Sequence, residues 1–236
     1  MKKWRLIFHP DPCNGFYNMA VDETLATLWR EEVSLPVLRI YQWSKPTLTV
    51  GYGQKTGEAL NTVYLRKRNI DLIRRVTGGR GVLHWDELTY SVISGRSGFF
   101  PDSISGTNKI IQAALLDALF ELGIAAQAVR SETTGEGEAC FSASSFHEIN
   151  VEGKKISGSA QRRLKSSFIQ HGSILLSTDT EALVDCFRYS CPTKKEAYLK
   201  FLRTRMAGIN EVTCAEVGFE ELREALIKAA RTRFQS

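Results

Sequence analysis

The sequence lacks an apolar run long enough to cross a membrane, which takes about 18 consecutive apolar residues. Its most apolar stretch, residues 110–126, is interrupted by Gln112, Asp117 and Glu121. The basic opening segment 1–10 carries an apolar part that is too short for a secretory signal peptide. We therefore expect a protein that does not span a membrane and that acts in the cytoplasm.

Proline is scarce and no segment has low complexity. The 236 residues include 6 prolines and 18 glycines, with 43% hydrophobic and 24% charged residues. This composition is close to the average for globular proteins, which excludes fibrous and disordered classes. At roughly 100–200 residues per domain, we interpret 1–236 as one domain, with its motifs within about 1–180 and a helical remainder at 181–236.

The cysteines suit neither a disulfide framework nor a metal site. Their number is odd, and no export signal accompanies them, so we expect thiols. Two of them are five positions apart, which is not a zinc-knuckle spacing, and no second pair or nearby histidine completes four ligands. The five are Cys13, Cys140, Cys186, Cys191 and Cys214.

Positive charge is in moderate excess. The chain has 31 Lys and Arg residues against 26 Asp and Glu residues, a formal net charge of +5. The excess favours anionic partners such as nucleic acid, phosphorylated ligands or acidic proteins, and it does not choose among them.

Hydrophobic periodicity alternates between strand-like and helix-like segments, which predicts a mixed α/β fold. Asn18 is predicted to cap a helix over 19–29. Strands are predicted at 47–52 and 87–92. In the first strand Leu48, Val50 and Tyr52 share one face. In the second strand Leu88, Tyr90 and Val92 do the same, so both strands are predicted to be half-buried.

The second half of the chain continues this alternation. A helix is predicted over 107–122, where Gly123 ends it. A hairpin is predicted over 148–157 with its turn at Glu152 and Gly153. A strand over 168–177 and a basic amphipathic helix over 220–234 follow, and the acidic segment 131–138 is predicted to be a surface loop.

A glycine-rich segment at 74–84 follows a predicted strand and reads Arg-Arg-Val-Thr-Gly-Gly-Arg-Gly-Val-Leu-His. Its guanidinium groups and backbone N–H groups could hold a phosphate, a carboxylate or an acyl oxygen. A plain turn with its arginines in solvent fits equally well. The segment is neither a Walker loop nor a dinucleotide fingerprint, and it does not repeat as RNA-binding Arg-Gly segments do. The guanidinium groups are those of Arg74, Arg75 and Arg80, and the backbone N–H groups are those near Gly78 and Gly79.

A second basic segment follows the predicted hairpin turn. Lysines at a turn ordinarily face solvent. Lys154 and Lys155 point to opposite faces of the strand, however, so one of them can face inward, with Ser157 or Gly158 beyond it. An inward lysine would place a fixed positive charge in a partly dry pocket.

Together these segments resemble the lipoate-protein ligase and octanoyltransferase superfamily. The resemblance extends over about 1–180 and implies an α+β catalytic domain like that of biotin ligases and class II synthetases. Such a domain has a mixed sheet flanked by helices and a narrow acyl-chain tunnel. The matching segments, besides 74–84, are 18–23, 39–43, 46–51, 87–91, 153–163 and 170–176.

Within this superfamily the ligases use ATP, whereas the transferases pass an acyl group through a cysteine. The segment 139–148 resembles that of the cysteine-dependent transferases, and the match implies Cys140 as nucleophile with Lys155, 15 positions later, as its activator. A nearby ammonium also lowers the pKa of a thiol on physical grounds. The alternative for Cys140 is a small buried apolar residue.

The resemblance further implies a set of substrate-binding residues, including glycine-loop backbone donors for an oxyanion and a histidine that shapes the pocket wall. His171 is interpreted as structural. Arg80 stands where the ligases have a third glycine, Trp85 follows the histidine, and the chain after Leu176 is short for the ligases' accessory domain. These departures favour a transferase. The substrate-binding residues that the resemblance implies are Arg74, Arg75, Gly78, Gly79, His84 and Gly158.

The sequence thus predicts transfer of an octanoyl group from octanoyl-acyl carrier protein to a lysine of a lipoyl domain. Such domains include the glycine cleavage H protein and the 2-oxoacid dehydrogenase E2 component, and an acidic carrier would be steered by the positive charge. No ATP, metal or other cofactor is expected, and no nucleic acid. The alternatives are an ATP-dependent lipoate ligase, an amidotransferase between lipoyl domains, and a nucleic-acid binding module.

Overall fold

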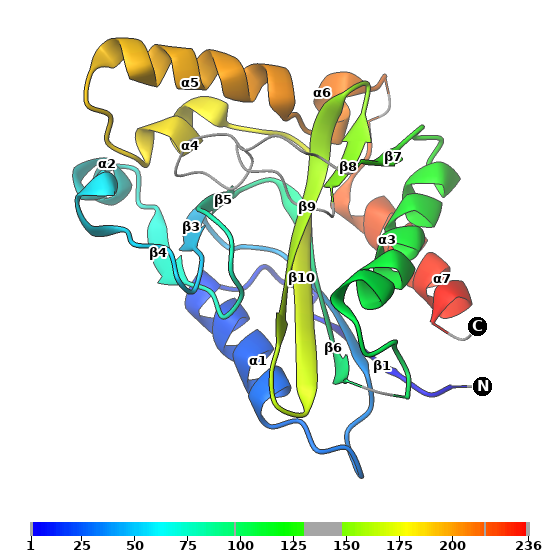
Figure 1. Ribbon diagram of the computed structural model, residues 1–236. Helices are drawn as coiled ribbons and strands as arrows, with labels where there is room; N and C mark the ends of the chain where they lie inside the picture. Colours follow the sequence, from blue (N-terminus) through cyan, green and yellow to red (C-terminus); the bar gives the residue numbers. More distant parts are fainter. Residues whose placement is uncertain (1, 97, 130–147, 215, 235–236) are drawn as a thin grey trace.

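A computed structural model describes residues 2–96, 98–129, 148–214 and 216–234. A seven-stranded sheet with the order β1-β2-β6-β10-β9-β8-β7 forms its centre (Figure 1). β1 is parallel to β2 and the other neighbours are antiparallel, so the sheet is mixed. Its strands are β1 (Arg5–Phe8), β2 (Val37–Tyr41), β6 (Glu87–Gly95), β7 (Gln127–Val129), β8 (Glu148–Val151), β9 (Lys154–Arg163) and β10 (Ser167–Leu175).

Two helices, α3 (Ile104–Glu121) and α7 (Phe219–Arg233), pack on each other and cover one face of this sheet (Figure 1). The predicted apolar stripe of α3 lies in the main core together with Leu88, Tyr90 and Val92 of β6. Gly123 follows α3 with a positive φ of 75°, which confirms it as the residue that ends the helix.

The other face carries α1 (Gly15–Thr27), which packs against β6 and β10, and a small sheet of order β4-β3-β5. Its strands are β3 (Thr47–Val50), β4 (Asp71–Arg74) and β5 (Val82–His84). Asn14 caps α1 by accepting from the backbone N–H of Tyr17. The predicted cap, Asn18, is wrong: it is buried one turn inside the helix, where its side chain accepts a hydrogen bond from Arg39.

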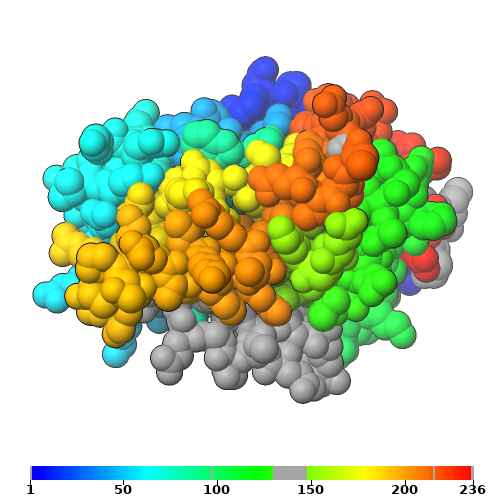
Figure 2. Space-filling view, turned by 90° about the horizontal axis from the view of Figure 1, so that it is seen from above, coloured from blue at the N-terminus to red at the C-terminus, as the bar shows by residue number. Residues whose placement is uncertain are grey.

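The remaining helices surround the small sheet and the end of β9. In Figure 2 the segments coloured cyan and those coloured yellow to orange lie on the opposite side of the molecule from α3, which is green. α4 and α5 pack on each other, and α5 also contacts β9. These elements are η1 (Gly57–Ala59), α2 (Thr62–Lys67), α4 (Thr180–Asp185), α5 (Pro192–Arg205) and α6 (Ile209–Val212).

The predicted hairpin is confirmed. β8 and β9 are antiparallel, and Glu152 and Gly153 between them have φ values of 50° and 78°. The strand predicted at 168–177 and the helix predicted at 220–234 correspond to β10 and α7. The acidic segment 131–138 and Cys140 lie outside the described residues.

The prediction of half-buried strands is wrong for both β3 and β6. All residues of both strands are buried, and Tyr52 lies beyond the end of β3 with its side chain exposed. In β6 the second face carries Glu87, Thr89 and Ser91, which are polar but form hydrogen bonds inside the protein. This polar, buried face of β6 borders the candidate site.

No helix in the described parts of the chain has both the length and the apolar character that crossing a bilayer requires.

The close approach of two glycines fixes the loop after β3. A Cβ atom on Gly51 would lie 1.9 Å from the carbonyl oxygen of Gly79. We therefore expect Gly51→Ala to lower the free energy of unfolding by about 1–3 kcal/mol, because the glycine-rich loop must shift. Gly53→Ala is the control, since its Cβ meets nothing within 4 Å. Urea denaturation compares the two, and equal stabilities would contradict the expectation.

Candidate active site

A cavity lies between the small sheet and the polar face of β6, β9 and β10. About 490 Å³ of space not filled by atoms, including the part open to solvent, lies within it. Part of its wall is apolar, and the rest carries histidine, arginine, lysine and hydroxyl groups. The apolar part is formed by Met19, Tyr41, Trp43, Val82 and Ala160.

Lys155 is the inward-facing lysine of the pair at the hairpin turn. It is 3% exposed and lines the cavity, and its Nζ donates to Oε1 of Glu148 at 2.8 Å. Glu148 begins β8, the strand beside β9, and is itself 3% exposed. The hairpin therefore fixes an ion pair in the cavity wall, where water screens it little.

The structure brings four of the predicted site residues to this cavity: Arg75, His84, Lys155 and Gly158. Three others, Arg74, Gly78 and Gly79, are not among the described residues that line it. Cys140 lies outside the described residues, so its approach to Lys155 stays a prediction.

The arginines of the glycine-rich segment hold the loop itself. Nη1 of Arg74 donates to the carbonyl oxygens of Gly51, Tyr52 and Gln54 at 2.6, 3.1 and 2.9 Å. Arg75 is 4% exposed, and its Nη2 donates to the carbonyl oxygens of Gly78 and Arg80 at 2.7 and 2.8 Å. The alternative that the arginines lie in solvent is therefore wrong for Arg75.

His84 connects two walls of the cavity. Its Nδ1 lies 2.7 Å from Oε1 of Glu87, and its Nε2 lies 2.9 Å from Oγ1 of Thr49. Burial raises the pKa of Glu87, but His84 and the hydroxyls of Ser173 and Thr89 outweigh it, so the pKa is lowered. Because an ionised carboxylate only accepts, Nδ1 of His84 is the donor to Glu87.

The ring of His84 is also held from one side. It stacks on Trp43 with centroids 4.1 Å apart and an interplanar angle of 15°. Nε1 of Trp43 donates to Oγ1 of Thr89 at 2.7 Å, and Oγ of Ser173 donates to Oε1 of Glu87 at 2.6 Å. The histidine ring is therefore fixed in position.

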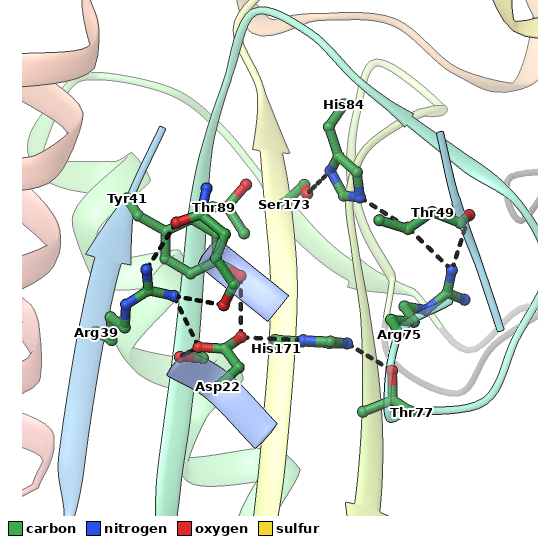
Figure 3. A network of polar contacts seen from close by, with 12 residues as sticks. Asp22, Arg39, Tyr41, Thr49, Arg75, Thr77, His84, Thr89, His171 and Ser173 are labelled. Carbon is green, nitrogen blue, oxygen red and sulfur yellow. Dashed lines mark hydrogen bonds and ion pairs between the residues drawn. The ribbon is translucent and has the colours of Figure 1, made fainter. Parts of the chain in front are cut away.

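A second polar network centres on Asp22 of α1 (Figure 3). Its Oδ1 accepts from Arg39 at 2.9 Å and from Ser91 at 2.8 Å, and its Oδ2 accepts from the Tyr41 hydroxyl at 3.0 Å. Nδ1 of His171 lies 3.3 Å from Oδ2. Burial raises the pKa of Asp22, but His171, Arg39 and Ser91 together lower it below its usual value.

His171 joins this network to the glycine-rich segment. Its Nε2 lies 2.5 Å from Oγ1 of Thr77, on the far side of the ring from Asp22 (Figure 3). Burial is the largest cause that lowers the pKa of His171, so the ring is neutral near pH 7. The histidine lines the cavity and holds its wall.

Sequence reasoning assigned no site role to Asp22, Arg39, Glu87 or Thr49. A signal was present, because Asn18 and Asp22 are four residues apart and so share one helix face, beside the buried Met19 and Ala26.

The lowered pKa of His171 predicts a pH-dependent stability. An unfolded histidine takes up a proton below about pH 6.5, whereas the folded one resists it, so stability is lost as the pH falls through 6.5 toward the folded pKa. We expect the free energy of unfolding to fall by about 1 kcal/mol from pH 7.5 to 5.5. Denaturation of His171→Gln should show a smaller fall, and parallel curves would contradict the assignment.

Comparison with known proteins places this architecture in a family. The model of the lipoyl protein ligase A/B catalytic domain matches residues 14–231. The chain belongs to the lipoyl protein ligase A/B catalytic-domain family. The resemblance seen in the sequence motifs is therefore confirmed.

Relatives of known name within the lipoyl protein ligase A/B family are similar over most of their length. Octanoyltransferase LipM of Halalkalibacterium halodurans is 37% identical, covering 95% of this chain and 84% of the relative. Octanoyltransferase LipM of Bacillus subtilis is also 37% identical, covering 97% of this chain and 85% of the relative. At this identity and coverage the chain is an acyltransferase.

Solved structures of the lipoyl protein ligase A/B family share the fold. A bi-partite lipoate protein ligase from Thermoplasma acidophilum has a TM-score of 0.82 at 24% identity, covering 100% of this chain and 85% of that one. A lipoate protein ligase from the same organism with bound lipoic acid has a TM-score of 0.78 at 25% identity, with coverages of 100% and 87%. The predicted mixed sheet flanked by helices is confirmed.

Proposed function

We propose that this chain transfers an octanoyl group from octanoyl-acyl carrier protein to a lysine of a lipoyl domain, through a thioester on Cys140. Octanoyl transfer in protein lipoylation follows from the similarity to the LipM octanoyltransferases over almost the whole chain. The donor, the covalent intermediate and the choice of acceptor, such as the glycine cleavage H protein or a 2-oxoacid dehydrogenase E2 component, form the proposal. It takes residues 1–236 as one catalytic domain.

The observation that carries the proposal is the buried lysine in a partly apolar cavity. Lys155 is held at the wall by Glu148, while Met19, Trp43 and Val82 supply apolar surface. An acyl chain needs apolar surface around its carbons and a charged or polar group near its carbonyl. A relative of the same fold carries bound lipoic acid, which has an eight-carbon acyl chain like that of octanoate.

The proposed reaction consists of two acyl exchanges. The Cys140 thiolate attacks the octanoyl thioester, so that a new carbon–sulfur bond forms and the carrier's thiol leaves with its electron pair and takes up a proton. The neutral amine of the acceptor lysine then attacks the enzyme thioester. A carbon–nitrogen bond forms, Cys140 leaves as the thiolate, and the nitrogen releases a proton. A thioester keeps the carbonyl reactive toward an amine.

In this scheme the ammonium group of Lys155 stabilises the negatively charged thiolate of Cys140. A free thiol has a pKa near 8.5, so most of it is protonated at neutral pH, and a close ammonium favours the anion. Each unit by which the pKa falls corresponds to about 1.4 kcal/mol. Cys140 precedes Glu148, the partner of Lys155, by eight positions along the chain, and this short connection supports the pairing.

The other predicted site residues position the acyl group. Gly158 lines the cavity and passes close to Gly172, where an added Cβ would lie 2.6 Å from the carbonyl oxygen of Gly158. His84 forms part of the cavity wall, and Arg75 holds the glycine-rich loop. Backbone N–H groups near Gly78 and Gly79 stabilise the oxyanion in this proposal, and Arg74 fixes the neighbouring loop.

The test is a transfer assay with octanoyl-acyl carrier protein and a lipoyl domain, without ATP. We expect Cys140→Ser to abolish transfer and Cys191→Ser, a change at an exposed thiol, to leave it unaltered. A parallel reaction supplies free octanoate and ATP. Transfer that requires ATP and survives Cys140→Ser would overturn the proposal in favour of an adenylating ligase.

A further inference from the structure

A second cavity lies directly behind the wall that holds His84. About 320 Å³ of space not filled by atoms, including the part open to solvent, lies within it, and Glu87 is part of its lining. Oε1 of Glu87 accepts hydrogen bonds from the first-cavity residues Thr89 and Ser173 at 2.5 and 2.6 Å. Glu87 therefore lines the second cavity and is hydrogen-bonded to two residues that line the first.

The backbone joins the two cavities at another point. Met206 lines the second cavity and Lys155 lines the first, and these two residues form an isolated parallel β-bridge between α5 and β9. The second cavity thus lies beside the backbone of β9 at the residue that we assign as activator of the cysteine.

The carboxylate of Glu87 is satisfied on one side only. Oε1 accepts hydrogen bonds from Trp43, His84, Thr89 and Ser173, whereas Oε2 is buried and has no hydrogen-bond partner among the described residues. Glu87 is 2% exposed, and its pKa is lowered, so the group is ionised at neutral pH. A buried carboxylate oxygen without a donor is costly, and a cationic donor beside it would remove that cost.

The lining of the second cavity suits a cation on an apolar stem. Leu183 and Met206 supply apolar surface, and Trp85, which is 46% exposed, presents an indole ring. Asp179 adds a second carboxylate, whose Oδ1 accepts from the backbone N–H of Ala182 at 2.8 Å. Aromatic faces and carboxylates both attract ammonium groups, and a lysine side chain carries its charge on an apolar chain.

We propose that this second cavity is a subsite for a primary alkylammonium group, namely the side chain of the acceptor lysine. The proposal deepens the function above and rests on it. Glu87 Oε2 receives hydrogen bonds from the ammonium, while Asp179 supplies additional negative charge and Trp85 packs on the stem. The subsite holds the lysine next to the octanoyl cavity before the neutral amine attacks the thioester.

The first test measures binding of n-butylammonium by the indole N–H resonance of Trp85, assigned by its absence in Trp85→Phe. The matched probe is 1-butanol, which has the same number of heavy atoms and no charge. We expect butylammonium to shift the resonance with an affinity at least about tenfold higher than that of butanol. Equal affinities, or no shift with butylammonium, would overturn the proposal.

The second test uses Asp179→Asn, which removes the charge while the asparagine side chain still caps α4. Glu58→Gln, at an exposed carboxylate outside the cavity, is the control for a change of one charge. We expect Asp179→Asn to raise both the Kd for butylammonium and the KM for the lipoyl domain several-fold, with Cys140 loading unchanged. An unaltered KM would refute the assignment to the acceptor lysine.

A third test uses Glu87→Gln, which removes the negative charge of the carboxylate that the ammonium is proposed to contact. It should abolish the butylammonium shift, and an unaltered Kd would overturn the subsite. If wild-type Cys140 forms no octanoyl adduct, the proposed function fails, whereas the butylammonium titration still decides whether the ammonium subsite exists.

Discussion

Replacing Lys155 by methionine is expected to slow octanoyl transfer by about 100-fold or more, a typical effect of losing a positioned acid–base or activating group. The side chain of methionine retains the apolar stem but removes the ammonium from the cavity. Because Glu148 would then be buried without Lys155, the variant is best made as Lys155→Met with Glu148→Gln, which removes both charges together.

The readout of this prediction is the reactivity of the thiol as well as turnover. Alkylation of Cys140 by iodoacetamide, followed by peptide mass across pH, reports the thiolate fraction. We expect half-maximal reactivity at a higher pH in the double variant than in the wild type. Lys154→Ala, next to Lys155 on the opposite face of β9, is the control and should change neither value. Wild-type rates in the double variant would contradict the role of Lys155.

Replacing Arg39 by methionine is expected to lower the free energy of unfolding by about 3–5 kcal/mol, the usual cost of leaving one partner of a buried ion pair alone. Arg39 is fully buried, donates to Asp22 and to Asn18, and lies over the Tyr41 ring at 3.9 Å. Without it the Asp22 carboxylate has no adjacent full positive charge to offset its burial.

Two further variants make this stability prediction specific. Arg39→Met combined with Asp22→Asn removes both charges and should regain part of the lost stability. Arg233→Met breaks the exposed pair with Asp117 and should cost less than about 1 kcal/mol. Denaturant titration followed by circular dichroism compares all three. A loss for Arg39→Met no larger than that for Arg233→Met would be inconsistent with a buried network that supports the cavity.

Local patterns in the sequence were sufficient to predict most of the elements that frame the site. The i, i+3 and i+4 spacing of apolar residues located α3, and the turn residues Glu152 and Gly153 located the β8–β9 hairpin. The burial of β6 was underestimated, because its polar face, with Glu87 and Ser91, looks like a solvent face in the sequence. Only its partners on α1 and β10 make it interior.

The sequence predicted only the part of the site that a local pattern reveals. Strand alternation showed that one of Lys154 and Lys155 faces inward, and the partner Glu148 on β8 makes it Lys155. The contacts of Asp22 with Arg39 and His171 join positions 17 and 149 residues apart, which no local pattern connects. Arg74 holds the backbone carbonyl of Gly51 in a neighbouring loop, and its predicted contact with substrate stays a prediction.

The central claim is that Cys140 carries the octanoyl group, and the intact mass of the enzyme tests it most directly. The enzyme is incubated with octanoyl-acyl carrier protein and no lipoyl domain, then measured before and after hydroxylamine. The account predicts one octanoyl adduct that maps to Cys140, is released by hydroxylamine and is absent from Cys140→Ser. An unmodified enzyme that nevertheless octanoylates a lipoyl domain at full rate would contradict it.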